Sequence, residues 1–176
     1  DLQKAKDYIQ RTADFELTLV REQNLLNNVI EEIKSFINNN KAYNIVIDSL
    51  VFSDPTSQGF IVEENNYKML NSLFNENQIK QSISSNNKII WENQTVSFSL
   101  GAGVNDIQQF RRFYLVASKP AISSGMIQNP NAIISPPGSQ NAGQWVISLD
   151  MNKKGTRKWS TFTGSNIGKR VAIVLD

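Results

Sequence analysis

The chain has 176 residues, with 18 Lys and Arg against 16 Asp and Glu for a net charge of +2, and it has neither His nor Cys. This length suits one domain or two small ones with a sizeable core, and so small a charge excludes the strong positive field of a nucleic-acid or anionic-membrane binder. Without His or Cys, the Ser-His-Asp and Cys-His nucleophile systems and the usual structural zinc sites are excluded. We therefore expect a non-enzyme with no catalytic residues, no metal and no cofactor, and carboxylate-based hydrolysis stays open as the alternative.

The first third of the chain predicts two helices and two strands. Residues 2–11 place their apolar side chains on one helical face, and residues 15–20 alternate apolar and polar side chains as a half-buried strand does. Residues 43–52 are rich in β-branched side chains and predict a second strand. The clearest predicted helix covers residues 25–38, because five aliphatic residues recur there at helical spacing, namely Leu26, Val29, Ile30, Ile33 and Ile37.

The middle of the chain predicts further short elements. Residues 68–74 and 78–83 have the pattern of one broken helix or two short ones. Residues 88–91 and 96–100 are interpreted as a hairpin around Glu92-Asn93-Gln94, and residues 111–116 as another strand. Residues 118–143 are rich in Pro, Ser, Gly and Asn, so we expect most of them to be connection rather than core.

The last third predicts a strand, a helix and a second strand. Residues 144–149 alternate as a strand, and Asp150 or Asn152 can cap a helix over about 153–166 that ends near Gly168. Residues 171–175 predict a buried strand. No apolar stretch approaches the ~20 residues of a spanning helix. Since the first residues open straight into a helical pattern and the last close a strand, we expect the chain to continue at both ends in a longer protein.

Several motifs have an ordinary structural interpretation. The basic residues of 153–158, with Lys169 and Arg170, adjoin Trp159, but helical spacing turns this Trp away from Lys154 and Lys158, so a solvated helix face is favoured over nucleic-acid binding. Gly101-Ala102-Gly103 lacks the third Gly of a dinucleotide site, which favours a flexible turn. Glu31-Glu32 and Glu63-Glu64 are adjacent pairs that do not face each other, which favours surface solvation over acid–base catalysis.

Four aromatic residues are candidates for contact with an extended peptide. Beside Arg111-Arg112, an apolar groove could be lined by Trp91, Phe110, Phe113 and Tyr114. The alternative is that these aromatic side chains form the core of their own domain, and this alternative is the favoured one.

Segments at both ends of the chain resemble the SecD family of protein-export components. The C-terminal resemblance lies in residues 145–159 and in residues 163–176, which contain Thr163-Gly164-Ser165-Asn166-Ile167-Gly168-Lys169 followed by an Ala-Ile-Val-Leu-Asp strand. The N-terminal resemblance lies in Arg11-Thr12-Ala13 before Phe15-Glu16-Leu17. These blocks occur in the order found in SecD or in the SecD half of SecDF.

The resemblance implies a fold and a role. The fold is α+β, with an incomplete ferredoxin-like base formed by residues 1–20 and 118–176 and an inserted α/β head at 21–117. The role is that of an auxiliary module of Sec-dependent translocation on the extracytoplasmic side of the cell membrane, beside SecF and the SecYEG channel. It would bind unfolded preprotein and change conformation with the proton-motive force, and no nucleic acid or small-molecule substrate is expected. A purely structural spacer is the other alternative.

Overall fold

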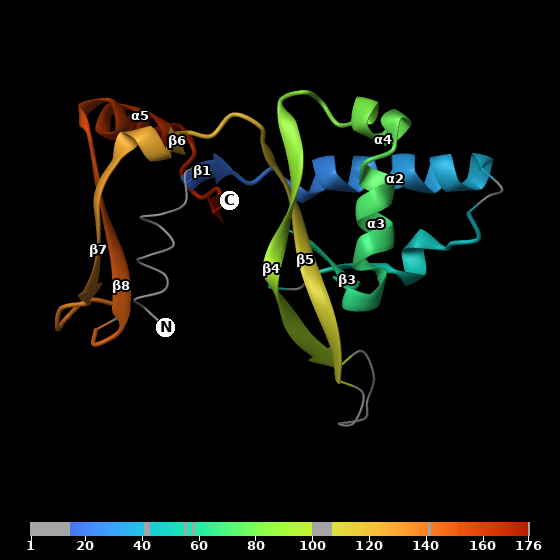
Figure 1. Ribbon diagram of the computed structural model, residues 1–176, viewed down its shortest axis with the longest axis horizontal. Coiled ribbons are helices and arrows are strands. Elements are labelled where there is room, and N and C mark those ends of the chain that lie inside the picture. The colour runs from blue at the N-terminus through green and yellow to red at the C-terminus, as the bar shows by residue number, and fades with distance from the viewer. Residues whose placement is uncertain are drawn as a thin grey trace. The chain divides into compact units, whose positions relative to one another are not determined.

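The computed structural model divides the chain into two compact units. It describes residues 15–40, 43–54, 56–57, 59–99, 107–140 and 142–175, so the helix expected at 2–11 and the turn at Gly101-Ala102-Gly103 lie outside the described residues. Unit 1 comprises Asp1–Leu19 with Lys119–Asp176, and unit 2 comprises Val20–Ser118. Both units combine helices with strands, which confirms the expected α+β class (Figure 1).

The two ends of the chain meet in a three-stranded antiparallel sheet of unit 1. Strand β1 (Phe15–Leu19) pairs with β6 (Ile122–Ser123) on one side and with β9 (Val171–Leu175) on the other. Leu17 is the register partner of both Ile122 and Ile173. The predicted strands at both ends are therefore confirmed, and they lie side by side.

A hairpin and a helix are further described elements of unit 1. Strand β7 (Ile127–Ile134) pairs with β8 (Trp145–Met151), after the short 3₁₀ helix η3 (Ser124–Met126). Helix α5 (Lys153–Ser165) begins where the Asn152 side chain accepts a hydrogen bond from the Gly155 N–H at 2.9 Å, as one of the two proposed caps. Trp159 packs against the small core of Phe15, Leu17 and Ile122, as its helical spacing predicted.

Two expectations for unit 1 are wrong. Residues 118–143 are not mostly connection, since β6, η3 and β7 lie within them. Strand β9 is not buried: Val171, Ile173 and Leu175 are 36%, 64% and 41% exposed. The reason is that α5 contacts β6 and β8, so the apolar cover over β6 and β1 does not extend to β9.

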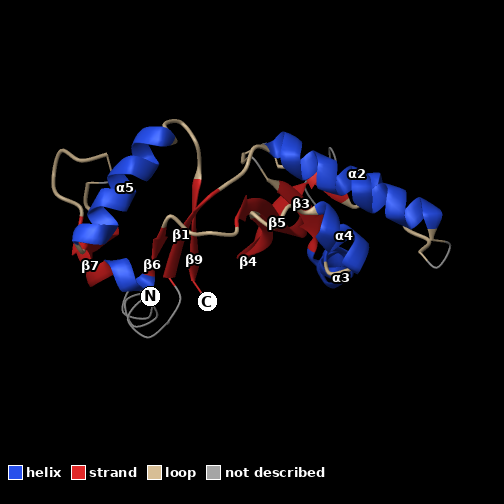
Figure 2. Ribbon diagram, turned by 90° about the horizontal axis from the view of Figure 1, so that it is seen from above, coloured by secondary structure: helices blue, strands red, loops and turns tan. Residues whose placement is uncertain are grey.

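Unit 2 is a four-stranded antiparallel sheet with helices packed on one face. The strand order is β2 (Val51–Ser53), β3 (Phe60–Glu63), β5 (Ile107–Ala117) and β4 (Asn87–Ser99). Helices α2 (Gln23–Asn39), α3 (Tyr67–Phe74) and α4 (Asn77–Ser82) lie to one side of it (Figure 2). Their aliphatic side chains form one core with Phe113 and Leu115 of β5, and this core contains all five residues that predicted the helix at 25–38.

Two expectations for unit 2 are also wrong. Residues 43–52 are not one strand, because the 3₁₀ helix η1 (Ile47–Ser49) interrupts them; the Ser49 hydroxyl donates to the Val46 carbonyl at 2.8 Å and favours this turn. Residues 88–91 and 96–100 do not form the expected hairpin, since 88–91 and the described residues 96–99 both pair with β5 as parts of β4. The two short predicted helices are confirmed as α3 and α4, which follow the 3₁₀ helix η2 (Glu64–Asn66).

No helix among these described residues combines the length and apolar character needed to cross a bilayer.

Candidate functional site: the bulged strand pair β4 and β5

The four aromatic residues singled out in the sequence lie on β4 and β5, but two of them are inaccessible. Phe110 and Phe113 are 0% exposed. A side chain with no exposed surface cannot contact a peptide in this conformation. Trp91 and Tyr114 are partly buried, so only these two retain surface at the site.

The Trp91 side chain is itself held by its neighbours. Its indole N–H donates to the Asn71 side-chain oxygen at 2.9 Å. The centroid of its ring lies 4.7 Å from the Tyr67 ring centroid and 4.8 Å from the Phe113 ring centroid. Such edge-on and tilted contacts fix the ring between α3 and the sheet. Trp91 therefore acts mainly as a packing residue.

A bulge of three residues in β4 is the main irregularity of the site. Trp91 pairs with Phe113 and Thr95 with Arg111, so Glu92, Asn93 and Gln94 together face the single residue Arg112. A bulge leaves backbone groups without ladder partners. The polar Glu-Asn-Gln sequence that predicted a turn is accommodated in this bulge instead.

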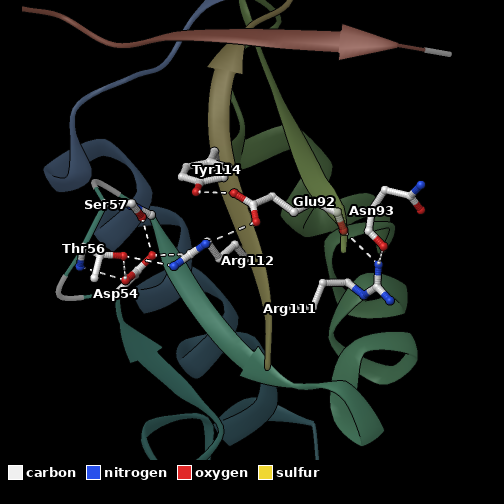
Figure 3. Close-up of polar contacts among 9 residues, drawn as sticks. Asp54, Thr56, Ser57, Glu92, Asn93, Arg111, Arg112 and Tyr114 are labelled. Carbon is white, nitrogen blue, oxygen red and sulfur yellow. Dashed lines mark hydrogen bonds and ion pairs between the residues drawn. The ribbon is translucent and has the colours of Figure 1, made fainter. Parts of the chain in front are cut away.

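Arg111 donates hydrogen bonds to backbone carbonyls of the bulge. One guanidinium nitrogen donates to the backbone carbonyls of Glu92 and Asn93, at 2.8 and 3.0 Å (Figure 3). The rest of the guanidinium forms two hydrogen bonds with the Glu64 carboxylate, at 2.7 and 2.6 Å, and lies 4.8 Å from the centre of the Tyr67 ring. The hydrogen bonds from Arg111 lower the pKa of Glu64, so this carboxylate is ionised and bound.

Arg112 makes a second set of contacts on the other face of the sheet, because consecutive strand residues point to opposite faces. Its Nε donates to the Asp54 Oδ2 at 2.6 Å, and a terminal nitrogen donates to the Thr56 hydroxyl at 3.0 Å (Figure 3). Its other terminal nitrogen lies 3.5 Å from a carboxylate oxygen of Glu92. One arginine therefore connects the turn after β2 with the bulge of β4.

Asp54 is a buried carboxylate, and both of its oxygens accept hydrogen bonds. It is 3% exposed, and it accepts hydrogen bonds from the Thr56 N–H and hydroxyl at 2.8 and 2.7 Å and from the Ser57 hydroxyl at 2.7 Å. Burial by itself would raise the pKa of Asp54, but the hydrogen bonds from Ser57, Thr56 and Arg112 outweigh it and lower the pKa to about 2.

Tyr114 completes the set of contacts on the Arg112 face. Its hydroxyl donates to a Glu92 carboxylate oxygen at 2.8 Å. A Cβ on Gly59 would lie 2.5 Å from the Tyr114 ring and 2.7 Å from the Phe113 carbonyl oxygen, so only glycine fits there. Burial raises the pKa of Tyr114, and the adjacent Glu92 raises it further, so the hydroxyl stays protonated and can donate.

The chemistry of these two sets of contacts is structural rather than catalytic. Asp54 and Glu92 converge on Arg112, yet both carboxylates accept hydrogen bonds from neighbours, and an acid with a pKa of about 2 is no general acid near neutral pH. Within the described parts of the chain, no three acidic side chains lie close enough together to hold a metal ion. The two arginines stand out in the sequence, but their partners do not. The Asp-x-Thr-Ser sequence at 54–57 has turn composition and is the signal that could have indicated Asp54.

Comparison with known proteins finds similarity over parts of the chain. The family described as "SecDF, P1 head subdomain" matches residues 101–176. A segment of 50 residues is 42% identical to the protein translocase subunit SecD of Acetobacter pasteurianus, and one of 30 residues is 53% identical to that of Rhodothermus marinus. Over these parts of its length, the chain is similar to SecD proteins. The likeness to the curated SecD subunits covers 28% and 17% of the chain but only 9% and 5% of those longer proteins. No solved structure matches the chain.

The family match crosses both units of the chain. It begins within unit 2 and continues through nearly all of unit 1 after Ser118. It therefore includes strand β5, with Arg111 and Arg112, as well as α5 and β9.

Proposed function

We propose that this chain is an extracytoplasmic module of Sec-dependent protein translocation that binds emerging preprotein. In the longer protein, membrane helices would couple a conformational change of the module to the proton-motive force, and binding would hinder return of the preprotein into the channel. The observation that carries this proposal is the match to the SecD family. That similarity supports a role in Sec protein translocation, and preprotein binding and proton coupling are the finer parts of the proposal.

Within this proposal, the two units have different roles. Unit 1 is the base, of an incomplete ferredoxin-like kind, and unit 2 is the inserted head. The antiparallel pairing of β1 with β9 supports a base built from both chain ends. The separate helical core of unit 2 supports an insertion that folds around its own apolar residues. Since the matched family range crosses both units, this division rests on these contacts rather than on the description of the family.

The match to SecD proteins supports the proposed location and partners. The module lies on the outer side of the cell membrane, with SecF and the SecYEG channel as partners of the full-length protein. Unfolded preprotein is the transient partner. Trp91 and Tyr114 are the two predicted contact residues that keep some exposed surface, whereas Phe110 and Phe113 would contribute to preprotein binding only through the fold.

Site-specific crosslinking tests this function in the full-length protein. A photoreactive amino acid at the exposed position Asn75 or Ser85 of unit 2 is expected to crosslink to a preprotein arrested during translocation. The exposed position Thr161 on α5 of unit 1 provides the matched control. If unit 2 is only a structural spacer, neither position crosslinks while export continues normally, and the proposal fails.

A further inference from the structure

The first half of β4 presents an unpaired edge to a neighbouring cavity. In the sheet of unit 2, β4 is at one end of the strand order, and no strand among the described residues pairs with its outer side. The segment 87–91 precedes the bulge and is regular, with one-to-one pairing to β5. Exposed sheet edges of this kind can accept an additional strand.

The backbone groups that face outward can be assigned from one hydrogen bond. The Ser118 N–H donates to the Asn86 carbonyl at 2.9 Å, so these residues form a hydrogen-bonded pair. Because such pairs alternate along an antiparallel ladder, Lys88 and Ile90 bond to β5, whereas Ile89 and Trp91 direct their N–H and C=O groups away from it. The assignment agrees with the Leu115 carbonyl, opposite Ile89, which accepts from the Arg21 N–H instead of from β4.

A cavity of about 340 Å³ lies where this edge meets helices α3 and α4. Its apolar wall comes from Phe74, Ile83 and Ile89. Its polar wall includes Asn71, whose side-chain oxygen is occupied by the Trp91 indole but whose amide N–H groups are not used by that bond. An extended chain added to β4 would direct alternate side chains toward the helices, and so toward this cavity.

The charged residues of the cavity are all basic. Among the described residues that line it, Lys80 and Lys88 are charged and none is Asp or Glu. Lys80 is exposed in the last turn of α4 and forms no ion pair with any other described residue. A side chain that enters the cavity therefore meets an apolar wall, amide donors and a cation, which together favour a carboxylate.

We propose that the edge of β4 from Asn87 to Trp91 binds an extended, acidic polypeptide segment as an added strand, with an Asp or Glu side chain in the cavity beside Lys80. Main-chain hydrogen bonds to Ile89 and Trp91 give binding that tolerates many sequences. The cavity adds a preference for acidic residues. This inference rests on the proposed function for the nature of its physiological occupant, a preprotein in transit.

Peptide binding to the purified chain tests the preference. Three labelled peptides of about ten residues, rich in Thr, Val and Ser, differ only in a central Glu, Gln or Lys. By fluorescence anisotropy at low salt, we expect the Glu peptide to bind about threefold to tenfold more tightly than the Gln peptide, and the Lys peptide to bind most weakly. Equal binding of all three peptides would overturn the acidic preference.

Two variants test the location. Lys80→Glu is expected to reverse the order of affinity of the three peptides. Lys154→Glu, at an exposed position on α5, is expected to leave that order unchanged. Ile89→Pro removes an N–H that does not bond to β5 and that would bond to the added strand. It is therefore expected to weaken the binding of all three peptides by a similar factor. Thermal unfolding checks that Ile89→Pro folds; if it does not, the result with Lys80→Glu decides.

The outcomes separate this inference from the proposed function. Peptide binding that neither Lys80→Glu nor Ile89→Pro changes would refute the β4 site, while crosslinks from unit 2 to an arrested preprotein would still support the function. Absence of both peptide binding and crosslinks would refute the two together. Reversal of the peptide order by Lys80→Glu supports both.

Discussion

The Arg112 Nε and the Asp54 Oδ2 are 2.6 Å apart, although the two residues are 58 positions apart in the chain. This ion pair joins the central strand β5 to the turn after β2, and the Asp54 side chain is 0% exposed. Buried pairs of this kind are costly to break, because the remaining charge is left without a partner. The pair therefore fixes the face of the unit 2 sheet on which Glu92 and Tyr114 also lie.

Asp54→Asn is expected to destabilise the chain. The substitution removes the negative charge from Arg112 and places amide hydrogens against the donors of Thr56 and Ser57, so the free energy of unfolding should fall by about 3 kcal/mol. Urea unfolding at neutral pH measures the change. Asp48→Asn is the control, because that carboxylate pairs with Lys34 while 74% exposed and should cost less than about 0.5 kcal/mol. Equal effects of the two substitutions would contradict the role of Asp54.

Asp54 should also make stability depend on pH in the acid range. Its pKa in the folded chain, about 2, lies below the ordinary value of 3.8, so ionised Asp54 stabilises the fold above pH 3.8 and this contribution is lost as the pH falls toward 2. The difference in unfolding free energy between the wild type and Asp54→Asn should shrink by about 2 kcal/mol between about pH 6 and about pH 2. A difference that is constant with pH would exclude a depressed pKa.

Arg111→Lys should loosen the bulge without unfolding unit 2. Lysine keeps the charge but lacks the planar fork that reaches the Glu64 carboxylate and the two bulge carbonyls together. We expect the free energy of unfolding to fall by about 1 to 2 kcal/mol and amide hydrogen exchange to become faster in residues 92–95. Arg157→Lys, at an exposed position on α5, should change neither quantity. Unaltered exchange in the bulge of Arg111→Lys would show that these hydrogen bonds do not hold it.

Two glycines of α5 should respond to alanine in opposite directions. A Cβ on Gly155 would lie 2.9 Å from the Met126 carbonyl oxygen, so Gly155→Ala should destabilise the chain by about 1 to 3 kcal/mol. A Cβ on Gly164 meets nothing within 4 Å, and Gly164→Ala should stabilise by about 0.5 to 1 kcal/mol through helix propensity. Thermal unfolding of the two variants gives the sign of each change in stability. Changes of the same sign would contradict the packing of α5.

The parts of the fold that the sequence predicted well have strong local periodicity. Helix α2 follows from its aliphatic spacing, and α5 from a capping Asn152 and a stop near Gly168, which has a φ of 77°. The sequence predicts a turn at the bulge of β4, because Glu92-Asn93-Gln94 has turn composition. The bulge is stabilised by hydrogen bonds from Arg111 of the neighbouring strand to the Glu92 and Asn93 carbonyls. Local sequence does not contain that contact.

The candidate site was harder to predict for the same reason. The sequence indicates the aromatic residues of β4 and β5, but their burial depends on helices that contact them from distant positions, such as Phe74 against Phe113. The edge cavity combines three segments, and its basic character comes from Lys80 and Lys88, which have no special spacing in the sequence. Such sites become visible only when the strand order is known.

Amide hydrogen exchange during binding of an unfolded polypeptide tests the central claim, that unit 2 receives an extended chain, most directly. A reduced and alkylated protein is added to the purified chain, and its folded, disulfide-bonded form serves as the control. The account predicts slower exchange of the Ile89 and Trp91 amides with the unfolded form only, and no change at Lys88 and Ile90, which already bond to β5. Unchanged exchange at Ile89 and Trp91 under saturating unfolded polypeptide would contradict it.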